Sequence, residues 1–161
     1  MPDGRAWPRI SIVTPSYNQG RFIEETIRSV LLQGYPDVEY SVLDGGSSDE
    51  SVDMIHKYAR WLTYWVSESD RGQADALRRG FSGAQGELFG WINSDDLLAP
   101  GSLQVVANAY VRHPQFGLFA GSVENFEDGH FGQDHEAIRQ RNISFMNLLH
   151  ESSFKMRPAW H

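Results

Sequence analysis

The fold is decided by the stretch Leu88-Phe89-Gly90-Trp91-Ile92-Asn93-Ser94-Asp95-Asp96-Leu97-Leu98. Its first five residues are mostly apolar and predict a buried strand, and the polar residues that follow are typical of a strand ending at a sheet edge that carries chemistry. Hard divalent cations bind oxygen ligands, so Asp95 and Asp96 are candidate ligands of Mg²⁺ or Mn²⁺. For this stretch by itself, a turn and a helix cap made by the two solvated carboxylates is the simpler interpretation.

Three upstream segments repeat this pattern of a strand followed by a polar turn. Runs rich in β-branched and aromatic residues predict strands at 10–14, 38–43 and 62–66. The turns that follow them cover residues 15–20, 44–49 and 67–72. They are rich in glycine, serine, asparagine and aspartate, the residues that favour turns.

Apolar residues at helical spacing predict a helix between each pair of strands. The first helix carries its apolar stripe on Ile23, Ile27, Val30 and Leu31. The second begins after Ser48, which can cap it, and buries Val52, Ile55 and Ala59. The third is a short helix over 73–81 that Gly80 and Gly83 break.

Beyond Leu98 the pattern predicts a further helix, a strand and a less regular end. The helix begins near Pro100 and carries an apolar stripe at Leu103, Val106, Ala107 and Tyr110. A fifth strand is expected at 116–123 and a loop or lid at 124–141. A short helix and an extended segment are expected over 142–161.

Strands that alternate with helices of this length indicate right-handed βαβ units and a mainly parallel sheet of the α/β class. In such sheets ligands bind outside the carboxyl ends of the strands. The four polar turns therefore face one crevice, and four of them on one edge indicate a binding site where a single acidic turn would not.

Composition excludes several classes of protein. The 161 residues carry a net charge of -7, which disfavours nucleic acid as a partner because phosphate backbones are bound by clustered basic residues. There is no cysteine for a disulfide, and no run of about 18 apolar residues for a transmembrane segment. We expect a cytoplasmic protein. Its histidines lack zinc-site spacing, and neither a dinucleotide fingerprint, a Walker motif nor a hydrolase elbow is present.

The residue types in the four turns match the parts of a nucleoside diphosphate. Asp44 can accept a hydrogen bond from a base or ribose, backbone N–H groups after Thr14 can meet phosphates, and Arg71 can neutralise a diphosphate whose metal Asp95 and Asp96 bind. Two alternatives stay open. Asp44 can instead cap the next helix, and Arg71 can form a surface ion pair worth under about 1 kcal/mol.

The four motifs together resemble the N-terminal half of the inverting GT-A glycosyltransferases, the family numbered two. The quoted residues are Ile10 to Asn18, Leu43 to Asp49, Asp70-Arg71-Gly72 with Asp75-Ala76-Leu77, and Asn93-Ser94-Asp95-Asp96. Their order and separation match from Arg9 to about Ser102. The likeness continues less closely through His150-Glu151-Ser152-Ser153-Phe154 with Arg157 and Trp160, which looks like the family's acceptor-side segment.

The resemblance implies a Rossmann-like GT-A nucleotide-diphospho-sugar transferase fold and a site for a nucleotide-diphosphate sugar. By position, the nucleotide-sugar-binding residues are Thr14, Pro15, Tyr17, Asp44, Arg71, Asn93 and Asp95. Asp95 and Asp96 are the implied ligands of Mn²⁺ or Mg²⁺. The implied acceptor is a glycan or a lipid-linked molecule, which is compatible with peripheral contact with a membrane.

This sequence departs from the family pattern at three points. Asn93 stands where the first aspartate of the D-x-D motif is common, and Arg78 stands where an asparagine is usual. The family's catalytic base is an aspartate in a segment that we expect beyond His161, so we expect the C-terminal part of the fold to be missing. Such a base typically contributes about 10²–10⁴-fold.

The domain organisation follows from the same likeness. We expect residues 1–8 to be a flexible lead-in and residues 9–161 to form a single domain. Within it, residues 9–123 form the nucleotide-sugar-binding core, and residues 124–161 form a loop and a partial acceptor-side segment.

The sequence is compatible with three functions. The leading one is metal-dependent transfer of a sugar with inversion. The alternative is a truncated, non-catalytic module that binds nucleotide or a partner and self-associates through uncovered strands. A nucleotidyltransferase fits less well, because the glycine-rich first loop with its basic signature is missing after Val13.

Overall fold

The structure is a computed structural model that describes Gly4 and residues 6–121. The chain divides into two compact units, Met1–Val111 and Arg112–His161. In the second unit, the described residues 112–121 contain a turn near Pro114, beside which the rings of His113 and Phe116 lie 5.7 Å apart.

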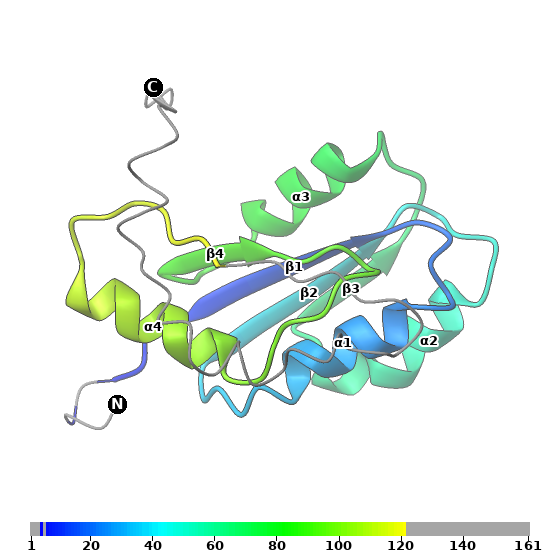
Figure 1. Cartoon of the computed structure of the whole chain (residues 1–161). Coiled ribbons are helices and arrows are strands. Elements are labelled where there is room, and N and C mark those ends of the chain that lie inside the picture. Colours follow the sequence, from blue (N-terminus) through cyan, green and yellow to red (C-terminus); the bar gives the residue numbers. More distant parts are fainter. Residues whose placement is uncertain (1–3, 5, 122–161) are drawn as a thin grey trace. The chain divides into compact units, whose positions relative to one another are not determined.

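Four parallel strands form the sheet of the first unit (Figure 1). They are β1 (Ile10–Ser16), β2 (Val38–Asp44), β3 (Tyr64–Ser67) and β4 (Leu88–Trp91). Their order is β3-β2-β1-β4, so β1 is hydrogen-bonded to both β2 and β4. This parallel pairing confirms the predicted α/β class.

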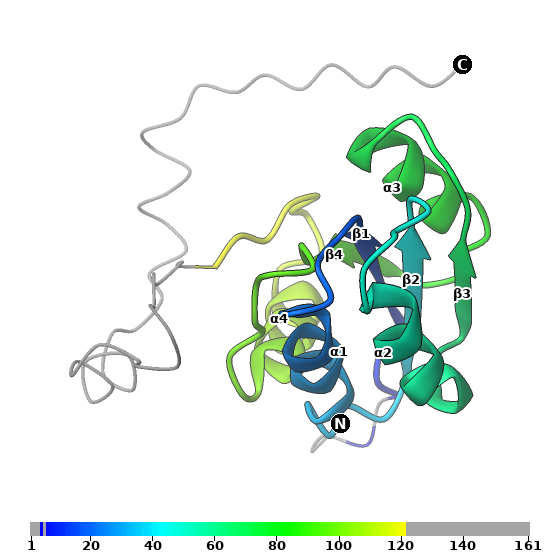
Figure 2. The same cartoon turned by 90° about the vertical axis from the view of Figure 1, so that its right-hand side faces the viewer.

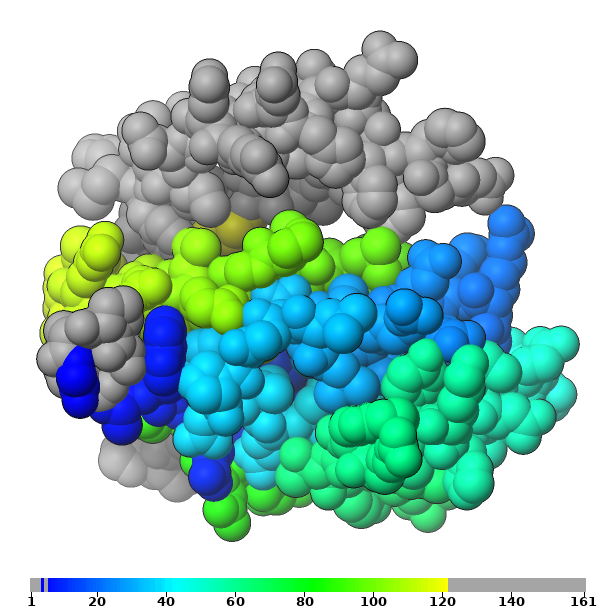
Figure 3. Space-filling view, turned by 90° about the horizontal axis from the view of Figure 1, so that it is seen from below, coloured from blue at the N-terminus to red at the C-terminus, as the bar shows by residue number. Residues whose placement is uncertain are grey.

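Helices cover both faces of the sheet. They are α1 (Ile23–Leu31), α2 (Ser51–Tyr58), α3 (Gln73–Ser82) and α4 (Ser102–Arg112), with a 3₁₀ turn, η1 (Ala59–Trp61), after α2. In Figure 1, α3 lies above the sheet, whereas α1, α2 and α4 lie below it. Figure 3, seen from below, shows these three helices over the lower face. None of the described helices is long and apolar enough to cross a membrane.

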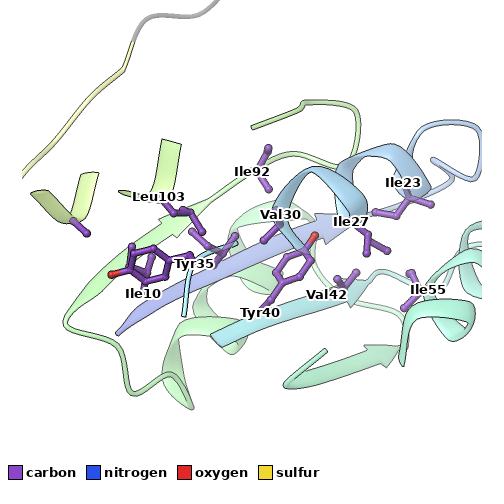
Figure 4. Packing of buried hydrophobic residues seen from close by; sticks show 12 residues of the cluster. Ile10, Ile23, Ile27, Val30, Tyr35, Tyr40, Val42, Ile55, Ile92 and Leu103 are labelled. Carbon is purple, nitrogen blue, oxygen red and sulfur yellow. The ribbon is translucent and has the colours of Figure 1, made fainter. Parts of the chain in front are cut away.

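Alternation along β1 and β2 divides the core between the two faces. Ile10 and Ile12 of β1, with Tyr40 and Val42 of β2, belong to the larger apolar cluster (Figure 4). The helices below complete that cluster with Ile23, Ile27, Val30, Ile55, Leu103 and Ala107. The intervening residues Val13 and Leu43 pack against Ala76 of α3 on the other face. The period of two in the strands therefore decides which helix each strand residue meets.

Several predicted element boundaries were wrong. Ser48 does not cap α2; instead Asp49 Oδ1 accepts hydrogen bonds from the backbone N and the Oγ of Ser51, at 3.0 and 2.5 Å. Gly80 lies inside α3 and does not break it. Residues 116–121 of the expected fifth strand contain no strand. The remainder of that strand, together with the predicted segments 124–141 and 142–161, lies outside the described residues.

The prediction that the fourth strand is buried was also wrong. In the described part of the sheet, β4 is an outer strand, and its residues alternate between half-buried and exposed. Phe89 is 56% and Trp91 60% exposed. A run of apolar residues in the sequence does not show whether a strand is paired on both sides. The side chains of Phe89 and Trp91 in this strand are exposed to solvent.

Gly80 allows α3 to approach the sheet closely. A Cβ atom at this position would lie 2.6 and 2.9 Å from the two Cγ atoms of Val13. Val13 is buried and β-branched, so its side chain cannot easily move aside. We expect Gly80→Ala to lower the free energy of unfolding by about 1–3 kcal/mol through overpacking, as measured by urea denaturation.

Gly83, at the end of the same helix, is the matched control. It has a negative φ of -103°, and a Cβ atom there would meet nothing within 4 Å. Gly83→Ala should therefore leave stability unchanged or raise it slightly. Equal destabilisation by both substitutions would contradict the packing explanation.

A charged contact joins α1 to α2. Glu24 Oε1 accepts hydrogen bonds from Lys57 Nζ at 2.7 Å and from the hydroxyl of Tyr58 at 2.6 Å. Lys57, and then Tyr58, hold the pKa of the Glu24 carboxyl below its usual value of 4.5. A lowered folded-state pKa contributes stability above the unfolded-state pKa and loses it as the pH falls through the folded-state pKa.

We therefore expect Glu24→Gln to destabilise the chain slightly at neutral pH and progressively less as the pH falls below about 4.5. Urea midpoints of both proteins across this range measure the difference. Glu25→Gln, at the exposed position next along α1, is the control and should show no comparable convergence. A constant difference at every pH would contradict the assignment.

Candidate functional site

A cleft of about 690 Å³ lies at the carboxyl ends of the strands. Figure 2 looks onto this edge of the sheet. All four predicted turns contribute to the lining, which consists of Pro15, Ser16, Tyr17, Gln19, Gly45, Gly46, Ser69, Asp70, Gly72, Gln73, Ala76, Asn93, Ser94 and Asp95. The structure therefore brings the four turns together at one edge, as the strand pattern predicts.

The turn after β1 is fastened to the turn after β2. Asn18 has a positive φ of 53°, and its Oδ1 accepts a hydrogen bond from the backbone N of Ser48 at 2.9 Å. Its own backbone N donates to Ser47 Oγ at 2.7 Å. Gly20 N donates to Asp49 Oδ2 at 2.8 Å, and hydrogen bonds from Ser51 and Gly20 hold the pKa of Asp49 below its usual value. Tyr17, at the tip, is 63% exposed above the cleft.

Asp44 organises the turn after β2. Its carboxylate is buried and accepts four hydrogen bonds, which come from Gly46 N, Ser47 N, Ser47 Oγ and Ser67 Oγ at 2.5 to 3.1 Å. The backbone of Gly45 and Gly46 is thereby presented to the cleft, while Asp44 lies behind it. This carboxylate shapes the turn, and the donor from Ser67 ties that turn to the end of β3.

The turn after β3 packs against these glycines. A Cβ atom at Gly45 would lie 3.2 Å from Asp70 Oδ1, the oxygen that accepts a hydrogen bond from Gly72 N at 2.7 Å. Gly72 has φ +98° and precedes α3, whose first residue, Gln73, lines the cleft. The amino end of α3 therefore opens on the cleft, where its unpaired N–H groups favour an anion.

The turn after β4 carries the acidic pair. Asp96 N donates to Asn93 O at 3.1 Å and closes the turn. Asp95 is exposed and lines the cleft, whereas Asp96 accepts a hydrogen bond from Asn93 Nδ2 at 2.9 Å. Thr26 Oγ1 of α1 donates to the Asp96 carbonyl at 2.9 Å, which fixes the backbone from below.

The donor set at this turn fits a divalent cation that is shared with a ligand. Within the described part of the chain, no three His, Asp or Glu side chains lie close enough to hold a metal ion together. The adjacent carboxylates of Asp95 and Asp96 supply hard oxygen ligands, and Mg²⁺ is usually held by one or two carboxylates plus substrate phosphates. The phosphates of a ligand would have to complete the coordination.

The predicted site residues fall into three positions. Pro15, Tyr17, Asn93 and Asp95 line the cleft. Thr14 and Asp44 are buried behind it, where Thr14 Oγ1 is hydrogen-bonded to the hydroxyl of Tyr40 at 2.9 Å. Arg71 and Asp96 are exposed beside lining residues, without lining the cleft themselves.

Gln73 is one of the cleft residues that the sequence interpretation missed, with Ser16, Gln19, Ser69, Ala76 and Ser94 among the others. Its Nε2 donates a hydrogen bond to Asn93 Oδ1 at 2.6 Å. The available signal was its place directly after Gly72, because the first residue of a helix that follows a parallel strand lies at the ligand-binding edge. The buried Oγ of Ser16, at the end of β1, has no hydrogen-bond partner among the described residues.

Comparison with known proteins identifies the family. The family model described as Glycosyl transferase family 2 matches residues 11–158. A glycosyltransferase of Nostoc is 30% identical over 105 residues, which cover 63% of this chain and 33% of that protein. A glycosyltransferase of Haemophilus influenzae is 27% identical over 152 residues, which cover 92% of this chain and 60% of that protein. The chain spans about a third of the length of the first of these curated relatives.

Solved structures share the fold. TarS of Staphylococcus aureus has a TM-score of 0.61 and 26% identity, and the match covers 66% of this chain and 20% of TarS. The mannosyltransferase PcManGT of Pyrobaculum calidifontis, solved with GDP-Man and Mn²⁺, has a TM-score of 0.56 and 28% identity, over 66% of this chain and 35% of that protein. The family match over most of the chain, with the parallel sheet and its edge cleft, shows that this chain belongs to glycosyl transferase family 2 and has the GT-A fold.

Proposed function

We propose that the cleft binds a nucleotide-diphosphate sugar and that the protein transfers this sugar to a glycan or lipid-linked acceptor with inversion, using Mn²⁺ or Mg²⁺. The observation that carries the proposal is the convergence of four polar turns on one cleft that Asp95 faces. The cleft volume of about 690 Å³ is in the range of small-molecule sites. Family membership supports the same reaction class.

In this proposal the first and second turns hold the nucleoside. Pro15 and the exposed ring of Tyr17 would contact base and ribose, and Thr14 would support them from the core. Asp44 would act on the base chiefly by setting the Gly45-Gly46 backbone, since four protein donors already engage its carboxylate. Arg71 and the amino end of α3 would favour the diphosphate.

Asp95 and Asp96 would hold the cation. When bound, a divalent cation offsets the negative charge that develops on the departing nucleoside diphosphate. PcManGT, which shares the fold, was solved with GDP-Man and Mn²⁺, and this supports a divalent cation here. Asn93 lies beside the pair and lines the cleft.

The acceptor hydroxyl needs a general base to take its proton. The proposal places that base outside the described residues, because the resemblance to the family implies an aspartate in a later segment. We also propose that the protein is cytoplasmic with peripheral membrane contact, and that it self-associates. We propose in addition that residues 9–123 form the nucleotide-sugar-binding core and residues 124–161 the acceptor-side segment.

Binding of nucleotide tests the donor site directly. We expect the full chain to bind UDP or GDP in calorimetry, and to bind the same nucleotide more tightly when Mn²⁺ is present. Asp95→Ala should weaken the Mn²⁺-dependent binding by more than about 100-fold, because a direct cation ligand matters more than the outer groups that already contribute 10–100-fold.

Asp53→Ala is the matched control, because it removes an exposed carboxylate on α2 that does not line the cleft. It should leave nucleotide binding unchanged. Failure of both UDP and GDP to bind with Mn²⁺ would overturn the proposed donor site, and equal losses in the two variants would overturn the role of Asp95.

Turnover separates an enzyme from a binding module. We expect release of UDP or GDP from UDP-GlcNAc or GDP-mannose in the presence of Mn²⁺ when the segment that carries the expected catalytic aspartate is included, and Asp95→Ala to abolish the release. Coupled detection of the free nucleotide measures this. Saturable binding without any release would instead favour the non-catalytic module.

A further inference from the structure

One hydrogen bond joins the start of α3 to the turn after β4. Gln73 Nε2 donates to Asn93 Oδ1 at 2.6 Å, and both residues line the cleft. α3 follows β3, so the bond connects segments that follow the two outermost strands of the described sheet. Residues 20 positions apart in the chain thereby form one side of the cleft.

Two hydrogen bonds, one from Gln73 and one to Asp96, hold the amide of Asn93 in one orientation. An asparagine amide has one accepting oxygen and one donating nitrogen, and Gln73 supplies a donor to the oxygen. The nitrogen is therefore turned away from Gln73, and it donates to Asp96 Oδ2 at 2.9 Å. The Asp96 carboxylate can only accept, so it decides which end of the Asn93 amide faces it, and the bond from Gln73 holds the amide in that orientation.

Asp96 is held at both its backbone and its side chain. Its backbone is fixed by the bond to Asn93 O and by Thr26 Oγ1, which is part of the buried face of α1. The printed contact of its side chain is the one from Asn93 Nδ2. If that amide turned over, an oxygen would face the carboxylate and the contact would be lost.

The three side chains lie outside the apolar core. Gln73 and Asp96 are exposed and Asn93 is half-buried. None of them belongs to either apolar cluster. Changing Gln73 therefore removes its hydrogen bond to Asn93 without removing core packing.

We propose that Gln73 is a positioning residue, acting through Asn93 to hold the Asp96 carboxylate ready for the cation of the donor site. The proposal rests on the proposed function, since it concerns the cation of that site. It gives Asn93 the role of an adaptor between α3 and the acidic pair, and it gives Gln73 no direct contact with the nucleotide.

A double-mutant cycle tests it. Gln73→Ala, Asn93→Ala and the double variant are compared by titrating Mn²⁺ into the full chain saturated with UDP, or with GDP where only GDP binds the wild type. Gln73→Ala should weaken Mn²⁺ binding by about 2- to 10-fold, the range for one lost neutral hydrogen bond. In the Asn93→Ala background, the same change should have no further effect, because the residue through which Gln73 acts is gone.

Two further measurements exclude a merely structural role. The thermal midpoint of Gln73→Ala should equal that of the wild type, and this variant should weaken nucleotide binding without Mn²⁺ by less than it weakens Mn²⁺ binding. Gln85→Ala, which removes an exposed glutamine that does not line the cleft, should leave Mn²⁺ binding unchanged.

The outcomes distinguish the two proposals. Absence of Mn²⁺-dependent nucleotide binding in the wild type would overturn the proposed function. If the wild type binds normally, three outcomes would overturn only the role of Gln73. The two single effects could add in the double variant, Gln73→Ala could change nothing, or Gln73→Ala could weaken nucleotide binding equally without Mn²⁺.

Discussion

The parallel pairing of β1 with both β2 and β4 is the constraint on which the site depends. Because the three strands run in the same direction, each delivers its following turn to the same edge, and β3 adds a fourth turn beside β2. The register pairs Ser16 with Asp44, so β1 and β2 end at the same height, whereas β4 ends opposite Val13, three residues before the end of β1. The cleft is a consequence of this arrangement, and the helices on both faces keep the strands in place.

Around the cleft, the carboxylates that accept backbone hydrogen bonds differ in role from the exposed carboxylate of Asp95. Asp44, Asp49 and Asp70 accept hydrogen bonds from backbone N–H groups of their own turns, and thereby set the backbone that a ligand would meet. Asp95 faces the cleft from an exposed position. Acidic residues that look alike in sequence therefore divide into those that shape the turns and one that lines the cleft from an exposed position.

The sequence predicts the parallel sheet, most helix positions and the common edge of the four turns, because strand and helix periods are local properties. It does not predict that Gly80 belongs inside α3, since the approach of Val13 depends on tertiary packing. Nor does it show that Phe89 and Trp91 are exposed. It also does not show that Asp49, and not Ser48, accepts the hydrogen bond from the backbone N of Ser51 at the start of α2. The link from Gln73 to Asn93 joins distant segments, and no local pattern indicates it. Whether the predicted residues bind donor and cation stays a prediction.

The turns after β1 and β2 are connected through Asn18, Gln19 and Gly20 by four hydrogen bonds to residues 47–51. The start of α3 and the turn after β4 are connected by the bond between Gln73 and Asn93. More hydrogen bonds therefore join the two turns on the first side of the cleft than join α3 to the turn on the second side. Under the proposed function, the nucleoside would meet a surface whose shape is set before it binds.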